Sequence, residues 1–241
     1  MNRLIILLLT MTIIVSCGNK KSPFDYTALP AEWTIYDEEK IERKSKNPTD
    51  LVRSDETIFE KFFGDLNNDG EEDCVVITKQ TEKSAFVTDE YRGELDRNRR
   101  GILITLKDGE YYHTVLKIPD CFSSENEDGG VYFAPELSVE IKKGNLIVHY
   151  GHGRYGWWQY TFRYRNNNFE LIGYDETDLY AYSSISINFL TKKQQTKVNA
   201  NLDPDGEEVE TWQDIDVKNL VKLTDIRDFD EFSIRDYYPE K

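Results

Sequence analysis

Apolar and polar residues alternate along much of the chain from about Trp33 onward, with the period of two that is typical of half-buried β-strands. The clearest example pairs residues 102–106 with residues 111–118 across a polar segment that contains Asp108 and Gly109. An Asp-Gly pair supplies the positive φ angles of a tight turn. The pattern therefore predicts an antiparallel β-hairpin.

The same pattern recurs further along the chain. It predicts hairpins of residues 137–141 with 146–150, of 157–165 with 169–174 and, more weakly, of 185–190 with 194–200. Residues 217–223 suit a short helix or a strand, and residues 81–100 and 119–130 are expected to be irregular, candidate functional loops. The expected fold is mainly β, with antiparallel meander or sandwich-like sheets and few short helices.

The N-terminus has the pattern of a secretory signal, with Arg3 before an apolar run that ends at Val15. Ile14-Val15-Ser16-Cys17 resembles a bacterial lipobox, which implies that Cys17 is acylated, for example with palmitate, and begins the mature chain. The predicted organisation is a lipoprotein signal peptide at 1–16, a lipidated N-terminus and tether at 17–30, and one mainly-β domain at 31–241. The alternative is a simple signal peptide with an incidental cysteine.

The residues after Cys17 bear on the location of the protein. The start Ser-Cys-Gly-Asn-Lys-Lys resembles that of Bacteroidota lipoproteins, and Gly18 stands where an aspartate favours retention in the inner membrane of enterobacteria. This resemblance implies a cell-envelope protein anchored by lipid to the outer membrane. The absence of an acidic run after the cysteine favours the periplasmic face.

Composition excludes one class of partner. The chain has 241 residues, of which 30 are Lys or Arg and 45 are Asp or Glu, so its formal net charge is −15. An acidic surface repels phosphate backbones. Nucleic-acid binding is therefore not expected.

An acidic loop follows Gly64 and carries the most specific chemical pattern in the chain. Calcium prefers hard oxygen ligands, which a tight loop delivers at alternate positions, with glycine at the sixth position for the turn. Here Gly70 occupies that sixth position. The predicted ligands of a structural Ca²⁺ are Asp65, Asn67, Asp69, Glu71 through its carbonyl, and Asp73.

The loop departs from an EF-hand, because Val76 stands at position twelve and the flanks are strand-like. Over residues 59–78 it resembles the FG-GAP or VCBS type of strand-loop-strand calcium site. As a whole, the chain resembles uncharacterised Bacteroidota lipoproteins that carry one such loop. The alternative is a polar turn without metal. A second acidic loop, residues 201–209, has Val209 at the ninth position and is better interpreted as a solvated turn.

Cys74 and Cys121 remain if Cys17 is acylated. Outside the cytosol they could form a disulfide, because such bonds persist in oxidising compartments. Two buried reduced thiols are the equal alternative.

An aromatic segment, residues 149–165, is the second informative region. In a strand, Trp158, Tyr160, Phe162 and Tyr164 share a face that is expected to be core. The other face carries Trp157, Arg163 and Arg165, which form a candidate surface for a glycan or an envelope protein, unless the arginines simply pair across strands. His152 and Arg154, which flank Gly153, add a candidate binding loop.

Enzyme motifs such as a nucleophile elbow, a zinc-protease helix or a phosphate-binding loop are absent from the sequence, so no catalytic residue is nominated. The favoured hypothesis is a calcium-stabilised binding module for a glycan or an envelope protein. The alternatives are a hydrolase acting on a glycan or cell wall through paired carboxylates, and a structural envelope component without a ligand.

Overall fold

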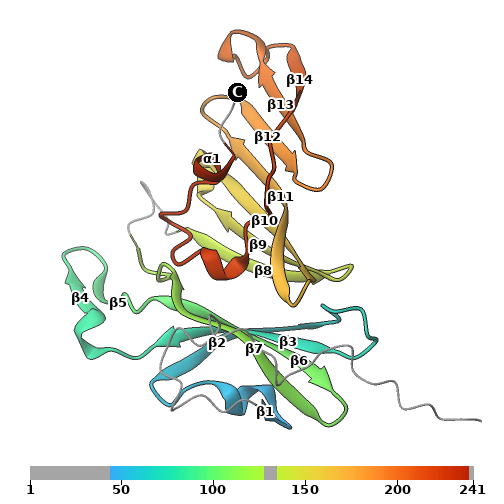
Figure 1. The fold of residues 1–241 in the computed structure, drawn as a ribbon. Helices are drawn as coiled ribbons and strands as arrows, with labels where there is room; N and C mark the ends of the chain where they lie inside the picture. The colour runs from blue at the N-terminus through green and yellow to red at the C-terminus, as the bar shows by residue number, and fades with distance from the viewer. Residues whose placement is uncertain (1–43, 128–134, 239–241) are drawn as a thin grey trace, which may run out of the picture.

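The computed structural model describes residues 44–127 and 135–238, and these form a mainly β, antiparallel protein (Figure 1). The predicted signal peptide, Cys17 and the tether at 17–30 lie outside these residues. Within them, no helix has the length and apolar character needed to cross a membrane.

Two large sheets and one small hairpin make up the fold of the described residues. The five-stranded sheet has the order β1 (Lys44–Ser45), β7 (Tyr111–Phe122), β6 (Arg100–Asp108), β3 (Asp73–Gln80) and β2 (Glu56–Gly64). The seven-stranded sheet is a meander of β14 (Glu208–Asp214), β13 (Lys193–Asn199), β12 (Ser183–Asn188), β11 (Asn168–Asp178), β10 (Gly156–Arg165), β9 (Asn145–Gly151) and β8 (Glu136–Lys142). β4 (Phe86–Asp89) and β5 (Gly93–Asp96) form the hairpin.

Helical structure in the described residues is short. It consists of the 3-10 turns η2 (Pro48–Leu51), η3 (Lys83–Ala85), η4 (Gly153–Tyr155), η5 (Ala200–Leu202) and η6 (Leu223–Asp225), together with one α-helical turn, α1 (Ile234–Tyr237).

The predicted hairpins are confirmed as β6–β7, β8–β9, β10–β11 and β12–β13. Three expectations are wrong. Residues 81–100 are not irregular, because they contain η3 and the β4–β5 hairpin. Residues 119–122 continue β7. Residues 217–222 form neither a helix nor a strand, and one isolated bridge joins Lys222 to Glu170 of β11.

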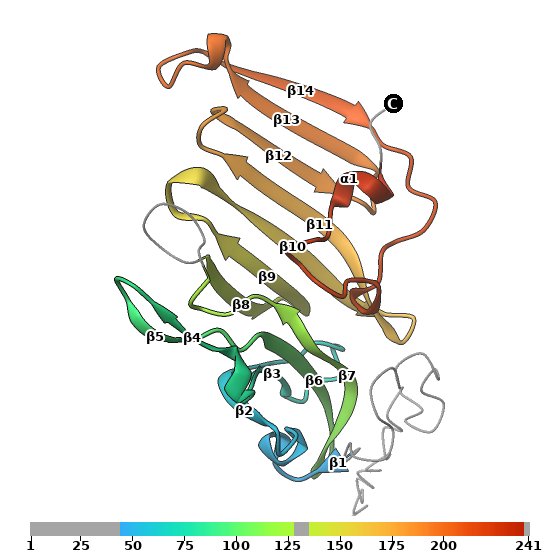
Figure 2. The same cartoon turned by 90° about the vertical axis from the view of Figure 1, so that its left-hand side faces the viewer.

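The main core lies between the two sheets and under the C-terminal segment, residues 215–238, which crosses one face of the seven-stranded sheet (Figures 1 and 2). It gathers buried side chains from both sheets, such as Ile104 of β6 and Val148 of β9. The C-terminal segment contributes Phe229, whose backbone N–H donates to the carbonyl of Cys121 at 2.9 Å. This contact ties the segment to the end of β7.

The two described cysteines are free, buried thiols in separate clusters. Cys121 belongs to the main core, whereas Cys74 packs with Leu51, Val76 and Leu103 in a smaller cluster. Burial raises the pKa of the Cys74 thiol to about 12 and also raises that of Cys121. Both cysteines are free thiols in the structure, which corresponds to the second alternative.

Candidate ligand-binding cavity

A cavity of about 280 Å³ lies between the seven-stranded sheet and the C-terminal segment. It is lined by side chains of β10, β11, the residue before η4, and the C-terminal segment. These are Trp158, Tyr160, Tyr174, Glu176, His152, Phe229, Asp230, Phe232, Ser233, Ile234 and Arg235.

Strand register builds the sheet side of the cavity. Trp158 of β10 lies directly opposite Glu176 of β11, and Tyr160 lies opposite Tyr174. Because residues two apart on a strand share a face, the four side chains form a block on the covered face of the sheet. The Tyr160 and Tyr174 ring centroids are 4.9 Å apart, and Trp158 and Tyr160 meet edge to face at 5.0 Å.

The C-terminal segment closes the block from above with two phenylalanines. Phe229 stacks parallel to Trp158 with centroids 6.0 Å apart, and Phe232 lies 5.6 Å from Tyr160. Aromatic rings in such contact are rigid and amphipathic, so they offer flat, preorganised surfaces to a ligand. The sequence predicted this aromatic face of β10 as core, and the structure confirms that, with the cavity at its margin.

Polar groups are placed among the rings. The Tyr174 hydroxyl donates to Glu176 Oε2 at 3.0 Å. Burial raises the pKa of Asp230, and the carboxylate of Asp228 raises it further. Burial also lowers the pKa of His152, which favours the neutral imidazole. The cavity thus combines apolar faces with hydrogen-bonding groups of both kinds, as small-molecule sites do.

A buried polar relay lies behind the cavity, next to Asp230. Arg100 of β6 donates through Nη2 to the Tyr150 hydroxyl at 3.1 Å and through Nε to the Ser123 carbonyl at 2.8 Å. The Tyr150 and Ser123 hydroxyl oxygens are 2.6 Å apart, and a side-chain hydrogen bond from Ser123 lowers the pKa of Asp230. The relay joins the five-stranded sheet, the seven-stranded sheet and the C-terminal segment.

The predicted ligand surface on the other face of β10 does not come together. Trp157 is six and eight residues from Arg163 and Arg165 along the strand, which is about 20 Å or more at about 3.3 Å per residue. Arg163 donates to Asn145 Oδ1 at 3.0 Å, and Arg165 pairs with Glu170 at 2.9 Å. The structure thus separates Trp157 from both arginines along the strand and shows the cross-strand pairing of the alternative.

The two residues of the predicted binding loop, His152 and Arg154, have different surroundings. His152 lines the cavity, and its ring lies 6.2 Å from that of Trp158. Arg154 instead lies over the ring of Tyr155 at 5.4 Å, and Tyr155 stacks on Tyr180 at 5.3 Å. Of the five predicted ligand-binding residues, His152 is the one that lines this cavity.

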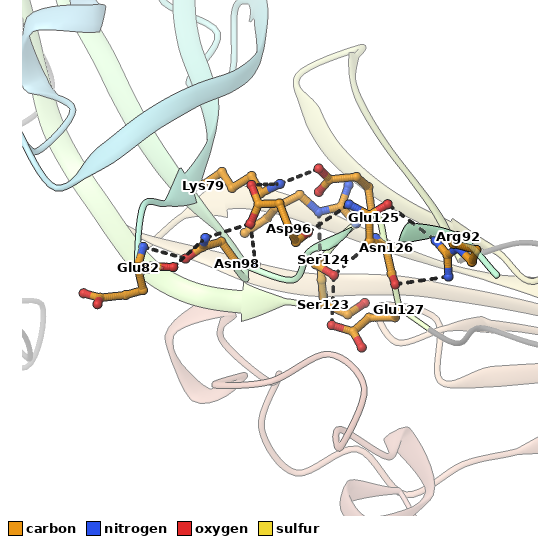
Figure 3. Close-up of polar contacts among 11 residues, drawn as sticks. Lys79, Glu82, Arg92, Asp96, Asn98, Ser123, Ser124, Glu125, Asn126 and Glu127 are labelled. Atoms are coloured by element: carbon orange, nitrogen blue, oxygen red, sulfur yellow. Dashed lines mark hydrogen bonds and ion pairs between the residues drawn. The ribbon is translucent and has the colours of Figure 1, made fainter. Parts of the chain in front are cut away.

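The loop after β7 is fixed by ion pairs (Figure 3). Lys79 of β3 is buried and pairs with Asp96 of β5 at 2.7 Å and with Glu125. Asn126 donates to the Asp96 carbonyl at 2.9 Å. Residues 123–127 are therefore held against β3 and β5 rather than free to close over a ligand, and residues 128–130 of the predicted functional loop lie outside the described residues.

The predicted calcium loop is a tight turn with its oxygens directed inward. Asp65 accepts hydrogen bonds from the N–H groups of Asp69 and Gly70 at 3.2 and 2.9 Å, and Asp69 accepts from Glu71 at 2.8 Å. Asn67 accepts from the Asp69 N–H at 3.1 Å. Gly70 has φ +89°, a conformation that favours glycine.

Two of the predicted metal ligands accept hydrogen bonds from residues outside the loop. The Glu71 side chain accepts a hydrogen bond from the Gly109 N–H at 2.8 Å. This contact does not involve the backbone carbonyl of Glu71, which is the predicted calcium ligand. Asp73 is fully buried and accepts from Leu66 at 2.7 Å and from Lys107 at 2.9 Å. Burial raises the pKa of Asp73 to about 7. Asp73 therefore holds the loop to β6.

The donor chemistry of the loop fits calcium, because two carboxylates, an amide and a carbonyl are hard oxygen donors. In the part of the chain that the structure describes, no group of three or more His, Cys, Asp or Glu side chains is arranged to hold a metal ion. The loop also abuts the other sheet, since a Cβ added at Gly144 would lie 2.7 Å from Asn68 Oδ1. Its rigidity therefore bears on how the two sheets pack.

Sequence reasoning missed most of the cavity. Glu176 falls two residues after Tyr174 in a strand that was predicted to end there. Asp230 follows Phe229 in a segment without helix or strand, so no periodicity predicts which way its side chain points. An aromatic-acidic alternation near the C-terminus, Asp228-Phe229-Asp230-Glu231-Phe232, was the available signal.

Comparison with known proteins supplies no relative on which to base a function. No family model, no curated protein and no solved structure matches the chain.

Proposed function

We propose that the chain is a lipid-anchored cell-envelope protein whose cavity binds a glycan. The observation that carries the proposal is the combination of aromatic rings with the carboxylates of Glu176 and Asp230 in one cavity. Sugar rings present apolar C–H faces that lie flat on aromatic rings, and hydroxyl groups that donate to carboxylates. The lipobox at Cys17 supports the anchoring and the envelope location.

The acidic loop has a structural role in this proposal. A Ca²⁺ held by Asp65, Asn67, Asp69 and the Glu71 carbonyl would supply charge neutralisation to a turn rich in carboxylates. The loop lies at the junction of the two sheets, where its Asn68 side chain approaches Gly144. A stiffer loop keeps the seven-stranded sheet, and with it the cavity, in place.

Replacing Trp158 is expected to weaken glycan binding by about tenfold or more, because its ring forms part of the cavity wall. The measurement is calorimetric titration of envelope oligosaccharides into the full-length protein, kept in a detergent without a sugar headgroup. Trp157→Ala is the matched control, because it removes the same ring one residue away on the opposite face of β10.

Arg235→Ala gives a second test that leaves the aromatic core intact, since Arg235 is exposed on α1. Equal affinity in Trp158→Ala, Arg235→Ala and the wild type would refute binding in this cavity. Turnover of the oligosaccharide that disappears in Glu176→Gln or Asp230→Asn would instead establish the hydrolase, which the two carboxylates in one cavity favour as the second candidate.

Calcium is expected to bind once per chain and to raise the melting temperature, with a stabilisation of about 2.7 kcal/mol at a hundredfold excess over Kd. Asp69→Ala should remove this response, because Asp69 is a predicted ligand. Melting curves of EDTA-treated protein with and without Ca²⁺ test it. Asp203→Ala, in the second acidic loop, should leave the response unchanged, and a lost response there would reassign the site.

A further inference from the structure

The charges in the cavity wall are unequal. Glu176 and Asp230 contribute two carboxylates, whereas Arg235 contributes one guanidinium from the exposed turn α1. Burial lowers the pKa of His152, so its imidazole adds no compensating charge at neutral pH. The wall therefore has an excess of negative charge.

Among the described residues, neither Glu176 nor Asp230 forms an ion pair within hydrogen-bond distance. Arg99 pairs with Asp228 at 2.8 Å and lies 3.8 Å from Asp230, beyond hydrogen-bond distance. The Ser123 hydroxyl, which lowers the pKa of Asp230, is neutral. A partly desolvated carboxylate with these neighbours gains from a cation that enters the cavity.

The aromatic rings favour the same kind of ligand. The face of an aromatic ring attracts a cation through its quadrupole, and Trp is the strongest of the three aromatic types. Trp158 lies directly across from Glu176, so one ring and one carboxylate adjoin on neighbouring strands. The net charge of −15 adds a long-range attraction for cations and repels anions.

We infer that the ligand of this cavity carries a protonated amino group, which sits against the aromatic rings between Glu176 and Asp230. This inference rests on the proposed function and narrows it to amino sugars whose nitrogen is free. Acetylation of that nitrogen removes its charge and abolishes both attractions. Selection for the free amine therefore follows from the charges and the rings together.

The test compares a glucosamine oligosaccharide with its N-acetylated counterpart and with a glucose oligosaccharide of equal length, by calorimetric titration into the full-length protein. The glucosamine oligomer is expected to bind about tenfold more tightly than the other two. Glu176→Gln should remove this difference. Asp175→Asn is the matched control, because Asp175 adjoins Glu176 on the opposite face of β11 and accepts a hydrogen bond from Ser186.

The outcomes separate the two claims. Equal binding of all three oligosaccharides, with loss in Trp158→Ala, would overturn the amine inference and retain glycan binding. Choline, a quaternary ammonium cation, is the probe without a sugar: binding of choline alone, lost in Glu176→Gln, would show a site for an organic cation and would overturn both the amino sugar and the glycan. No binding by any probe would overturn both. Asp230→Asn provides an independent check, and unchanged melting curves establish that each variant is folded.

Discussion

Asp73→Ala is expected to lower the free energy of unfolding by about 4 kcal/mol, among the largest effects that a single substitution in this chain should have. The Asp73 carboxylate is fully buried and accepts from two backbone N–H groups, those of Leu66 and Lys107. Alanine leaves both donors buried without an acceptor, and each such donor costs about 1–3 kcal/mol. Urea denaturation of the calcium-free protein measures the change.

Asp69→Ala is the matched control for this prediction. Its carboxylate accepts from Glu71 and Asn67 within the same turn, where the side chains are only partly buried. Its loss in calcium-free buffer should therefore cost about 1 kcal/mol or less. Asp73→Asn should fall between the two alanine variants, because an amide keeps one acceptor oxygen. If Asp73→Ala costs no more than Asp69→Ala without calcium, the carboxylate does not support the loop as described.

The loop illustrates what the sequence can and cannot predict. The spacing of acidic and amide residues around Gly70 predicts a turn between two strands, and the structure confirms a turn with inward oxygens between β2 and β3. The role of Asp73 was not predictable. Its partner Lys107 is 34 residues away, and strand pairing between distant segments decides that contact.

In strand β10, too, the sequence predicts some features and only the folded structure determines others. A period of two correctly places Trp158 and Tyr160 on the covered face. Periodicity does not indicate which residues of the other face could contact one ligand together. Nor does it indicate which residues on neighbouring strands compensate their charges. Arg163 bonds Asn145 and Arg165 pairs with Glu170 on the adjacent strands, and these partners are defined only by the folded sheet.

The cavity depends on a segment that has no periodicity at all. Phe229 and Asp230 belong to a stretch without helix or strand, and their placement is set by packing on Trp158 and by the bond from Phe229 to Cys121. Local propensity does not encode such contacts. A site formed between a sheet and an irregular segment is therefore visible only in the folded chain.

Arg100→Met is expected to lower the free energy of unfolding by about 3 kcal/mol. Arg100 is 2 % exposed and donates to both Tyr150 and the Ser123 carbonyl, and its guanidinium lies 4.9 Å from the Phe59 ring. Methionine fills a similar space but leaves a buried carbonyl and a hydroxyl without their charged donor. Urea denaturation measures the cost, and a change below about 1 kcal/mol would mean that the relay contributes little to folding.

The hydrogen bonds of the relay predict an energetic coupling between Arg100 and Tyr150 that packing alone would not produce. Tyr150→Phe keeps the ring and removes the hydroxyl that links Arg100 to Ser123, so it should cost about 2 kcal/mol. The double variant should cost less than the sum of the singles by about 1 kcal/mol or more, because the two changes break one shared contact. Since the Ser123 side chain also lowers the pKa of Asp230, Tyr150→Phe should weaken ligand binding in the cavity while the aromatic wall stays intact. Additive costs with unchanged affinity would show that Asp230 keeps its position without the relay.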